Sequence, residues 1–209
     1  MTVHDEHEAR SFCAGYTDDE GLKRLDRLAV LMLAENRVQN LIAKSSEEFL
    51  WRRHFADSAQ LLAYVSRKTS PWLDLGTGAG PPGLVIAAMR PDTVCVLVES
   101  RRKRAEWLSR AALELGLTNC RVEGRKLESV ESFSAGIISA RAFAPLPKLL
   151  DLSARFSTPD TMWLLPKGRS AGQEVQDLPT PSAALFHVEQ SATDPQAGII
   201  VGRGRPEPA

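Results

Sequence analysis

The sequence predicts an α/β protein, in which helices cover a parallel β-sheet and a helical extension precedes it. Two segments with helical periodicity lie within residues 18–65, and the pattern changes at residue 72. From there on, short apolar runs alternate with amphipathic stretches, which is the order that parallel strands joined by helices produce. We therefore expect two domains, a helical extension over residues 1–68 and an α/β core over residues 69–205.

The N-terminal extension is expected to contain two helices. In residues 18–36, apolar side chains recur at spacings of three and four, which places them on one face of a helix. Asp18 or Asp19 is suited to cap the start of this helix. Residues 46–65 are expected to form the second helix, with Ser46 as its N-cap.

The core is expected to alternate between strands and helices. Residues 93–98 form a continuous apolar run, which is typical of a strand buried on both faces. Residues 100–115 show helical spacing, and Gly116 is suited to end that helix. Further strands are expected at residues 72–75, 120–122, 136–139 and 161–165, further helices at 84–89 and 146–156, and a hairpin-like pair at 184–189 and 198–201.

Composition limits the classes of protein to which this chain can belong. Its 209 residues are 43% hydrophobic, which is ordinary for a packed globular protein. The longest apolar runs are too short to span a bilayer and the acidic N-terminus does not resemble a signal peptide, so we expect no membrane partner. Three cysteines without C-x-x-C spacing indicate neither a disulfide framework nor a zinc site, and we expect a cytoplasmic protein without a metal.

The net charge of zero counts against a strongly basic nucleic-acid-binding domain. The charges are nevertheless unevenly distributed. Residues 1–40 hold five Lys/Arg and eight Asp/Glu, whereas residues 99–126 hold eight Lys/Arg and four Asp/Glu. A local basic surface can attract phosphates while the protein as a whole stays neutral.

The glycine-rich stretch LDLGTGAGPPG, residues 73–83, admits two interpretations. From Gly78 onward it fits G-x-G-x-x-G, the dinucleotide fingerprint. From Asp74 onward it fits D-x-G-x-G-x-G, with glycines at Gly76, Gly78 and Gly80, a pattern associated with S-adenosylmethionine. Both ligands bind at the carboxyl ends of parallel strands and need glycines where the backbone approaches closely.

Asp74 discriminates between these two ligands. A carboxylate at the end of the first strand repels a pyrophosphate but suits the cationic ammonium of a methionine moiety, directly or through water. Pro81 and Pro82 lack the N–H donors that a dinucleotide loop gives to phosphate. Glu99, after the expected second strand, is suited to bind the ribose hydroxyls of either ligand. We therefore expect S-adenosylmethionine as cofactor, with NAD and dehydrogenase activity as the less favoured alternative.

Six motifs in a fixed order resemble those of the bacterial RsmG family, also called GidB. They are N-L-I-A at 40–43, R-H-F-A-D-S at 53–58, D-L-G-T-G-A-G-P-P-G at 74–83, E-S-x-x-K-R at 99–104, S-A-R-A-F-A at 139–144 and L-P-K-G at 165–168. The resemblance implies a class I S-adenosylmethionine-dependent methyltransferase fold. Such a fold has a Rossmann-like, seven-stranded, mostly parallel sheet, here with an N-terminal helical extension.

The resemblance also implies an activity and a partner. The family methylates N7 of guanine 527, in the 530 loop of 16S rRNA, with S-adenosylmethionine as the donor. The implied partner is 16S rRNA in the small ribosomal subunit or its precursor, and we expect the protein to act as a monomer.

Cofactor contacts carried over from the family fall on Gly76, Pro81, Lys126, Leu127 and Arg141. The family often has leucine where Pro81 stands, and it commonly has other residues at 126 and 127. A contact through a backbone N–H survives such changes, whereas a side-chain contact does not. The expected cofactor-binding residues are Asp74, Gly76, Gly78, Gly80, Pro81, Glu99, Lys126, Leu127 and Arg141.

Methylation of guanine N7 needs no general base, because this nitrogen carries a free lone pair at neutral pH. The enzyme has to place N7 and the methyl group in line, about 3–3.5 Å apart. Arg141, after an expected strand, is the expected catalytic residue, through guanine O6, a phosphate or the cofactor carboxylate. It cannot donate to N7, since that would occupy the attacking lone pair. A structural ion pair is the alternative role of Arg141.

Several other polar residues have two possible roles. His54 and Asp57 lie three apart on one helix face, and they either line the substrate cleft or, as we favour, hold the extension on the sheet. Arg101, Arg102 and Lys103, with Arg104, begin a helix, where cations are unfavourable. An rRNA phosphate would offset that cost, and a solvated face is the alternative. Lys167 is likewise expected to reach an RNA phosphate.

Two other functions remain open from the residues alone. A methyltransferase that acts on a small molecule or a protein would need a closed pocket and would have no use for the basic cluster. The near-neutral pI of 6.9 favours that alternative slightly. A noncatalytic nucleotide-binding or ribosome-associated module is less consistent with the intact glycine loop and Glu99.

Overall fold

The computed structural model describes residues 2–207 of the chain. Seven strands form one sheet in the order β3-β2-β1-β4-β5-β7-β6. The first five strands in this order, β3, β2, β1, β4 and β5, run parallel to one another. Strand β7 is antiparallel to both of its neighbours, β5 and β6. The strands are β1 (Trp72–Leu75), β2 (Cys95–Val98), β3 (Cys120–Glu123), β4 (Ile137–Ala140), β5 (Met162–Lys167), β6 (Phe186–Gln190) and β7 (Gly198–Arg203). The expected seven-stranded, mostly parallel sheet is confirmed.

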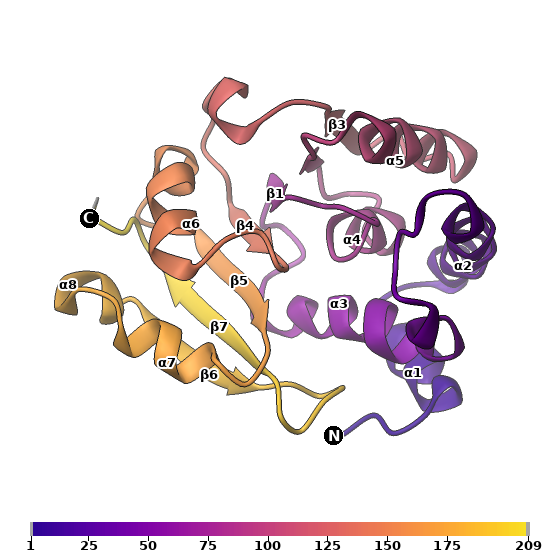
Figure 1. Cartoon of the computed structure of the whole chain (residues 1–209), viewed down its shortest axis with the longest axis horizontal. Coiled ribbons are helices and arrows are strands. Elements are labelled where there is room, and N and C mark those ends of the chain that lie inside the picture. The colour runs from indigo at the N-terminus through magenta and orange to yellow at the C-terminus, as the bar shows by residue number, and fades with distance from the viewer. Residues whose placement is uncertain (1, 208–209) are drawn as a thin grey trace.

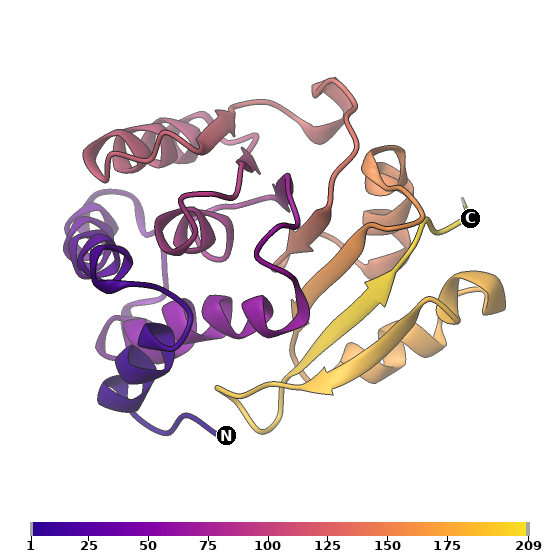
Figure 2. The same ribbon diagram turned by 180° about the vertical axis from the view of Figure 1, so that it is seen from behind.

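Helices cover both faces of this sheet (Figures 1 and 2). They are α1 (Glu6–Ala14), α2 (Asp19–Gln39), α3 (Asp57–Ala59), α4 (Gly83–Met89), α5 (Arg102–Glu114), α6 (Leu146–Ser153), α7 (Ala171–Gln176) and α8 (Thr180–Ala183). The N-terminal helices share one apolar core with α4 and α5, and α6 and α7 pack into a second core. None of the helices in residues 2–207 combines the length and the apolar character that crossing a bilayer requires.

Helix α2 begins as the sequence predicts. The carboxylate of Asp18 accepts a hydrogen bond from the N–H of Gly21 at 2.8 Å and so caps the first turn. Leu25, Leu28 and Met32, at spacings of three and four, are completely buried. The apolar stripe therefore packs α2 against α4 and α5.

The second helix differs from the prediction. Residues 44–64 form a continuous but irregular run of 3-10 helix η1 (Lys44–Phe49), π-helix η2 (Trp51–Ala56), α3 and 3-10 helix η3 (Gln60–Tyr64). Ser46 is not an N-cap, because it lies inside η1 and its N–H donates to the carbonyl of Ala43 at 2.8 Å. Leu50 and Phe55 are both buried although they are five positions apart. An α-helix turns such positions to different faces, and the i→i+5 spacing of a π turn brings them together.

The sequence pattern does not predict helices α1, α7 and α8. The buried residues of α1 are Ala9 and Cys13, which are too few to produce a visible apolar stripe. A polar contact positions this helix instead: the Glu6 carboxylate accepts hydrogen bonds from the N–H groups of Trp51 and Arg52, at 2.8 and 2.9 Å. Helices α7 and α8 have six and four residues, which is too short for a periodic signal.

Candidate functional site

The glycine loop connects β1 to α4 and crosses the carboxyl end of the sheet. Gly76, Gly78 and Gly80 all have positive φ angles, of 63°, 61° and 128°. A Cβ atom at Gly76 would lie 2.7 Å from the ring of Phe143, which follows β4. Glycine is therefore required at Gly76 both by its backbone conformation and by the close approach of a neighbouring loop.

Asp74 supports this loop from below. Its carboxylate is completely buried, and it accepts hydrogen bonds from the Ser139 hydroxyl at 2.6 Å and from the Gly83 N–H at 3.1 Å. Burial raises the pKa of Asp74 to about 6. These two hydrogen bonds hold β4 and the start of α4 against β1. The expected contact of Asp74 with the ammonium of a ligand, directly or through water, stays a prediction.

A cavity of about 550 Å³ opens beside the loop, and we call it the loop cavity. Its volume lies within the roughly 300–1,000 Å³ usual for small-molecule sites. It brings together most of the expected cofactor-binding residues, although neither Asp74 nor Gly80 lines it in the described part of the chain. The expected cofactor-binding residues that line it are Gly76, Gly78, Pro81, Glu99, Lys126, Leu127 and Arg141, and Arg101, which was expected to bind RNA, lines it as well.

Glu99 follows β2 and forms one wall of the loop cavity. One of its oxygens accepts a hydrogen bond from the Gly78 N–H at 2.9 Å, and the other accepts from the Arg101 N–H at 2.8 Å. A carboxylate has about four acceptor sites, so this arrangement fixes Glu99 and leaves it able to accept from ligand hydroxyls.

Arg141 follows β4 and contacts the irregular helical run. Its guanidinium lies 3.0 Å from His54 Nδ1, 3.2 Å from the Arg53 carbonyl oxygen and 3.5 Å from a carboxylate oxygen of Asp57. His54 and Asp57 therefore hold the extension to the sheet, as favoured. They also line cavities, His54 the loop cavity and Asp57 a second one. Their alternative role, lining the substrate cleft, stays a prediction.

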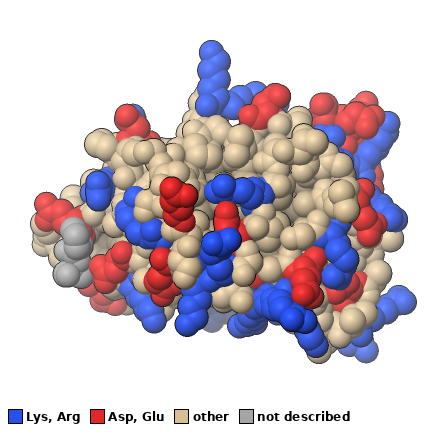
Figure 3. Space-filling view, turned by 90° about the horizontal axis from the view of Figure 1, so that it is seen from above, with Lys and Arg blue, Asp and Glu red and all other residues tan. Residues whose placement is uncertain are grey.

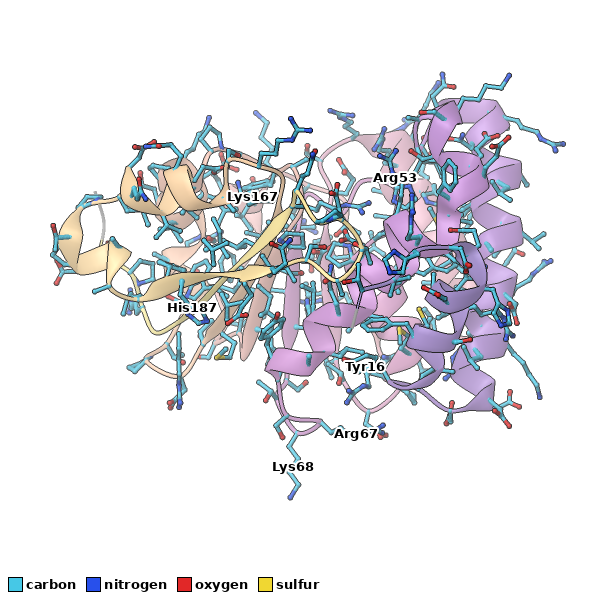
Figure 4. All side chains as sticks on the ribbon, turned by 90° about the horizontal axis from the view of Figure 1, so that it is seen from below. Tyr16, Arg53, Arg67, Lys68, Lys167 and His187 are labelled. Carbon is cyan, nitrogen blue, oxygen red and sulfur yellow. The ribbon has the colours of Figure 1, made fainter. Side chains whose placement is uncertain are left out.

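The second cavity, which we call the side cavity, has a volume of about 580 Å³. It shares Arg141 and Ala142 with the loop cavity. Arg53 and Lys167 line it from the helical run and from the end of β5, and Figure 4 shows both on one side of the molecule, away from Arg67. The two cavities thus meet at Arg141.

The loop between β6 and β7 forms the outer wall of the side cavity. Asp57 ties this loop to the helical run, because the hydroxyl of Thr193 and the amide of Gln60 donate to the same carboxylate oxygen, at 2.9 and 2.8 Å. The sequence reasoning missed Arg53 and Thr193. Arg53 lies within the R-H-F-A-D-S motif, which was the available signal, whereas the β6–β7 loop carries none.

Lys167 lines the side cavity, but its charge is already paired. Its side chain is 10% exposed, and Nζ lies 2.8 Å from a carboxylate oxygen of Glu174. The same Glu174 oxygen accepts from the N–H of Leu146 at 3.1 Å. Lys167 therefore ties the end of β5 to α7 in this structure, and a phosphate would have to compete with Glu174 for it.

The expected basic cluster is divided by the start of α5. Arg101 precedes the helix and lines the loop cavity, as does Arg104, whose guanidinium donates to the Asn40 carbonyl at 3.4 Å. Arg102 points outward and lies 3.2 Å from Glu106. Lys103 is exposed. On the face shown in Figure 3, Lys and Arg are interspersed with Asp and Glu, so the surface is not uniformly basic.

The described residues also bear on metal binding. Within residues 2–207, no three or more His, Cys, Asp and Glu side chains group together in a way that could hold a metal ion.

Comparison with known proteins gives a family for this site. The family model described as rRNA small subunit methyltransferase G (GidB) matches residues 22–196. The chain is 57% identical over 203 residues to ribosomal RNA small subunit methyltransferase G of Erythrobacter litoralis (strain HTCC2594), covering 97% of this chain and 98% of the relative. A relative of the same name from Novosphingobium aromaticivorans is 57% identical over 208 residues, covering 97% of this chain and 90% of the relative.

The fold also has solved counterparts. A SAM-dependent methyltransferase from Aquifex aeolicus matches with a TM-score of 0.58 at 14% identity, covering 80% of this chain and 96% of that chain. This structural likeness supports the fold, and the near-full-length relatives carry the assignment to a family. The chain therefore belongs to the rRNA small subunit methyltransferase G family, as the ordered motifs predict.

Proposed function

We propose that this methyltransferase transfers a methyl group from S-adenosylmethionine to N7 of guanine 527, in the 530 loop of 16S rRNA. The observation that carries the proposal is the shared position of Arg141, which lines both the loop cavity and the side cavity. A donor in one cavity and a base in the other would meet at this side chain. The substrate is the small ribosomal subunit or its precursor.

The residues of the loop cavity fit the cofactor. Glu99 would accept from the ribose hydroxyls, the backbone at Gly76 and Gly78 would lie against the ligand, and residues 126–127 would contact the adenine; all of these residues line the loop cavity. Leu127 is 3% exposed, which suits an apolar contact with a base. When bound, the cofactor supplies an electrophilic methyl group on a sulfonium.

The side cavity provides the place for the target base. Arg141 is held by three groups of the helical run, so the direction of its remaining N–H donors is fixed. Donation to guanine O6 would orient the base and leave the N7 lone pair free to attack. The carboxylate of Asp57 is next to Arg141 and favours the positive charge that N7 acquires on methylation.

Cations around the two cavity mouths contact the RNA backbone. Arg52 and Arg53 line the side cavity, and Arg101 lines the loop cavity. Phosphate contacts position an RNA without reading its sequence. Because the overall charge is zero, these few cations carry the electrostatic part of rRNA binding.

Methyl transfer to defined substrates tests the proposed function. Labelled S-adenosylmethionine is offered with unmodified 30S subunits, with naked 16S rRNA and with free nucleotides, and the methylated base is then mapped. The proposal expects one label, at N7 of guanine 527. Label at another base, or in none of the RNAs, would contradict it.

A small-molecule or protein methyltransferase is the second candidate. The observation in its favour is the mixed charge of the surface, together with a side cavity large enough for a small substrate. Absence of RNA labelling alongside tight cofactor binding would favour this candidate.

A further inference from the structure

His54 has a defined protonation state in this structure. Its Nδ1 lies 3.0 Å from the guanidinium of Arg141. A guanidinium has donors and no acceptor, so Nδ1 must accept and the ring proton must be on Nε2. Burial, together with the charges of Arg141 and Arg53, lowers the pKa of His54 to about 3. His54 is therefore neutral near pH 7 and presents an N–H donor at Nε2.

This donor has no partner of its own. Nε2 of His54 is buried and makes no hydrogen bond within residues 2–207. The residue is 9% exposed, and it lines the loop cavity. Buried polar atoms are nearly always hydrogen-bonded, so an unpaired one in a residue that lines a cavity points to a ligand that accepts from it.

The helical run holds His54 firmly in this position. His54 belongs to the π-helix η2, and such turns are frequent at functional sites. The Glu6 carboxylate fixes the start of η2 by accepting from two backbone N–H groups. At its other end, the carbonyl of His54 accepts from the Ser58 hydroxyl at 2.6 Å. The ring and its donor are thus preorganised before any ligand binds.

The charges around the loop cavity identify the accepting atom. Glu99, Arg141 and His54 all line this cavity, and Arg141 and His54 are in contact there. A cation beside a neutral N–H donor suits an anionic oxygen, and the carboxylate of the methionine moiety is the anionic group of S-adenosylmethionine. The target base, by contrast, is assigned to the side cavity, which His54 does not line in the described structure.

We propose that His54 binds the carboxylate of the cofactor's methionine moiety through Nε2–H, next to Arg141. The proposal rests on the use of S-adenosylmethionine but not on the identity of the target base. It can therefore be tested without RNA, and its failure would leave the proposed methylation of guanine 527 untouched.

The test compares two ligands against two variants by calorimetry. In His54→Asn, the amide oxygen can replace Nδ1 as the acceptor for Arg141, but no donor remains where Nε2 was. The variant should bind S-adenosylmethionine about tenfold more weakly or worse, as expected for the loss of a hydrogen bond to a charged group. It should bind decarboxylated S-adenosylmethionine as tightly as the parent protein does.

His54→Gln is the matched variant, since its amide N–H can reach the former position of Nε2. It should bind S-adenosylmethionine more tightly than His54→Asn does. Equal weakening of both ligands in His54→Asn would show a structural role and overturn the proposal. Unchanged binding of S-adenosylmethionine in that variant would overturn it as well. The decarboxylated ligand reports on folding in the same experiment.

Discussion

Replacing Arg141 by lysine tests the shared position of this residue at the two cavities. The guanidinium contacts His54 Nδ1, the Arg53 carbonyl and the Asp57 carboxylate, at 3.0, 3.2 and 3.5 Å. Lysine keeps the charge but has a single nitrogen on a flexible stem, so Arg141→Lys can keep about one of these three contacts.

The expected loss of activity follows from the N–H donors that Arg141 directs at the two cavities and that a single ammonium group cannot replace. At about 1.5 kcal/mol for each of two charge-assisted hydrogen bonds to the bound ligands, the loss is about 3 kcal/mol, which corresponds to roughly 100-fold in rate. The loss of stability is smaller, about 1 kcal/mol, because the ion pair with Asp57 is retained and both side chains are partly exposed, at 26% and 19%.

The assay measures methyl transfer to unmodified 30S subunits, together with denaturant unfolding of each variant. Arg27→Lys is the matched control, since Arg27 forms an exposed ion pair with Glu114 at 2.9 Å, away from both cavities. The control should keep full activity. Arg141→Ala should lose more activity than Arg141→Lys while remaining folded. Normal turnover in Arg141→Lys would refute the inferred role of this side chain.

Three further predictions concern the loop, the buried acid and the basic cluster. Gly76→Ala should weaken cofactor binding at least about tenfold, because φ is +63° and the new Cβ would lie 2.7 Å from a phenylalanine ring. Gly172→Ala is the control, since its Cβ meets no atom within 4 Å in the described chain. Equal calorimetric affinities of the two variants for the cofactor would contradict the expectation. Burial raises the pKa of Asp74 from 3.8 to about 6, so the folded protein binds this proton more tightly than the unfolded chain does. The resulting contribution to the free energy of unfolding is fully present below about pH 4. It is lost as the pH rises through 6, and the loss is about 3 kcal/mol. Asp74→Asn should therefore show a flatter decline of unfolding free energy between pH 4 and 6.5 in denaturant titrations, and a slope equal to that of the parent would count against this assignment. Replacing Arg101 and Arg102 by glutamate should weaken rRNA binding. It should also reduce the slope of log affinity against log salt concentration by about one for each lost phosphate contact. Binding that is unchanged at every salt concentration would exclude these two arginines from the RNA interface.

The sequence by itself determined the α/β core and the chemistry of its first loop. Local rules set these features: a strand buried on both faces is a continuous apolar run, and a turn with positive φ angles requires glycine at Gly76, Gly78 and Gly80. The position of the acid after the second strand could also be predicted, because Glu99 directly follows the apolar run that forms that strand. The ordered motifs then indicated the family.

The tertiary structure alone decided what the polar side chains do. Nothing in the sequence indicates that the two oxygens of Asp74 hold Ser139 and Gly83 inside the core. Lys167 was expected at a phosphate, yet it pairs with Glu174. Spacing along the chain does not reveal such partners, because they are chosen when different elements pack together.

The contact between Arg141 and His54 shows most clearly why the sequence does not reveal such partners. These residues are 87 positions apart, and they meet because β4 ends next to the irregular helical run that carries His54 in its π turn. Periodicity and turn chemistry depend on near neighbours and can be read from the sequence. Hydrogen bonds between distant segments depend on how side chains fill the shared core, and that is fixed only when the whole chain has folded.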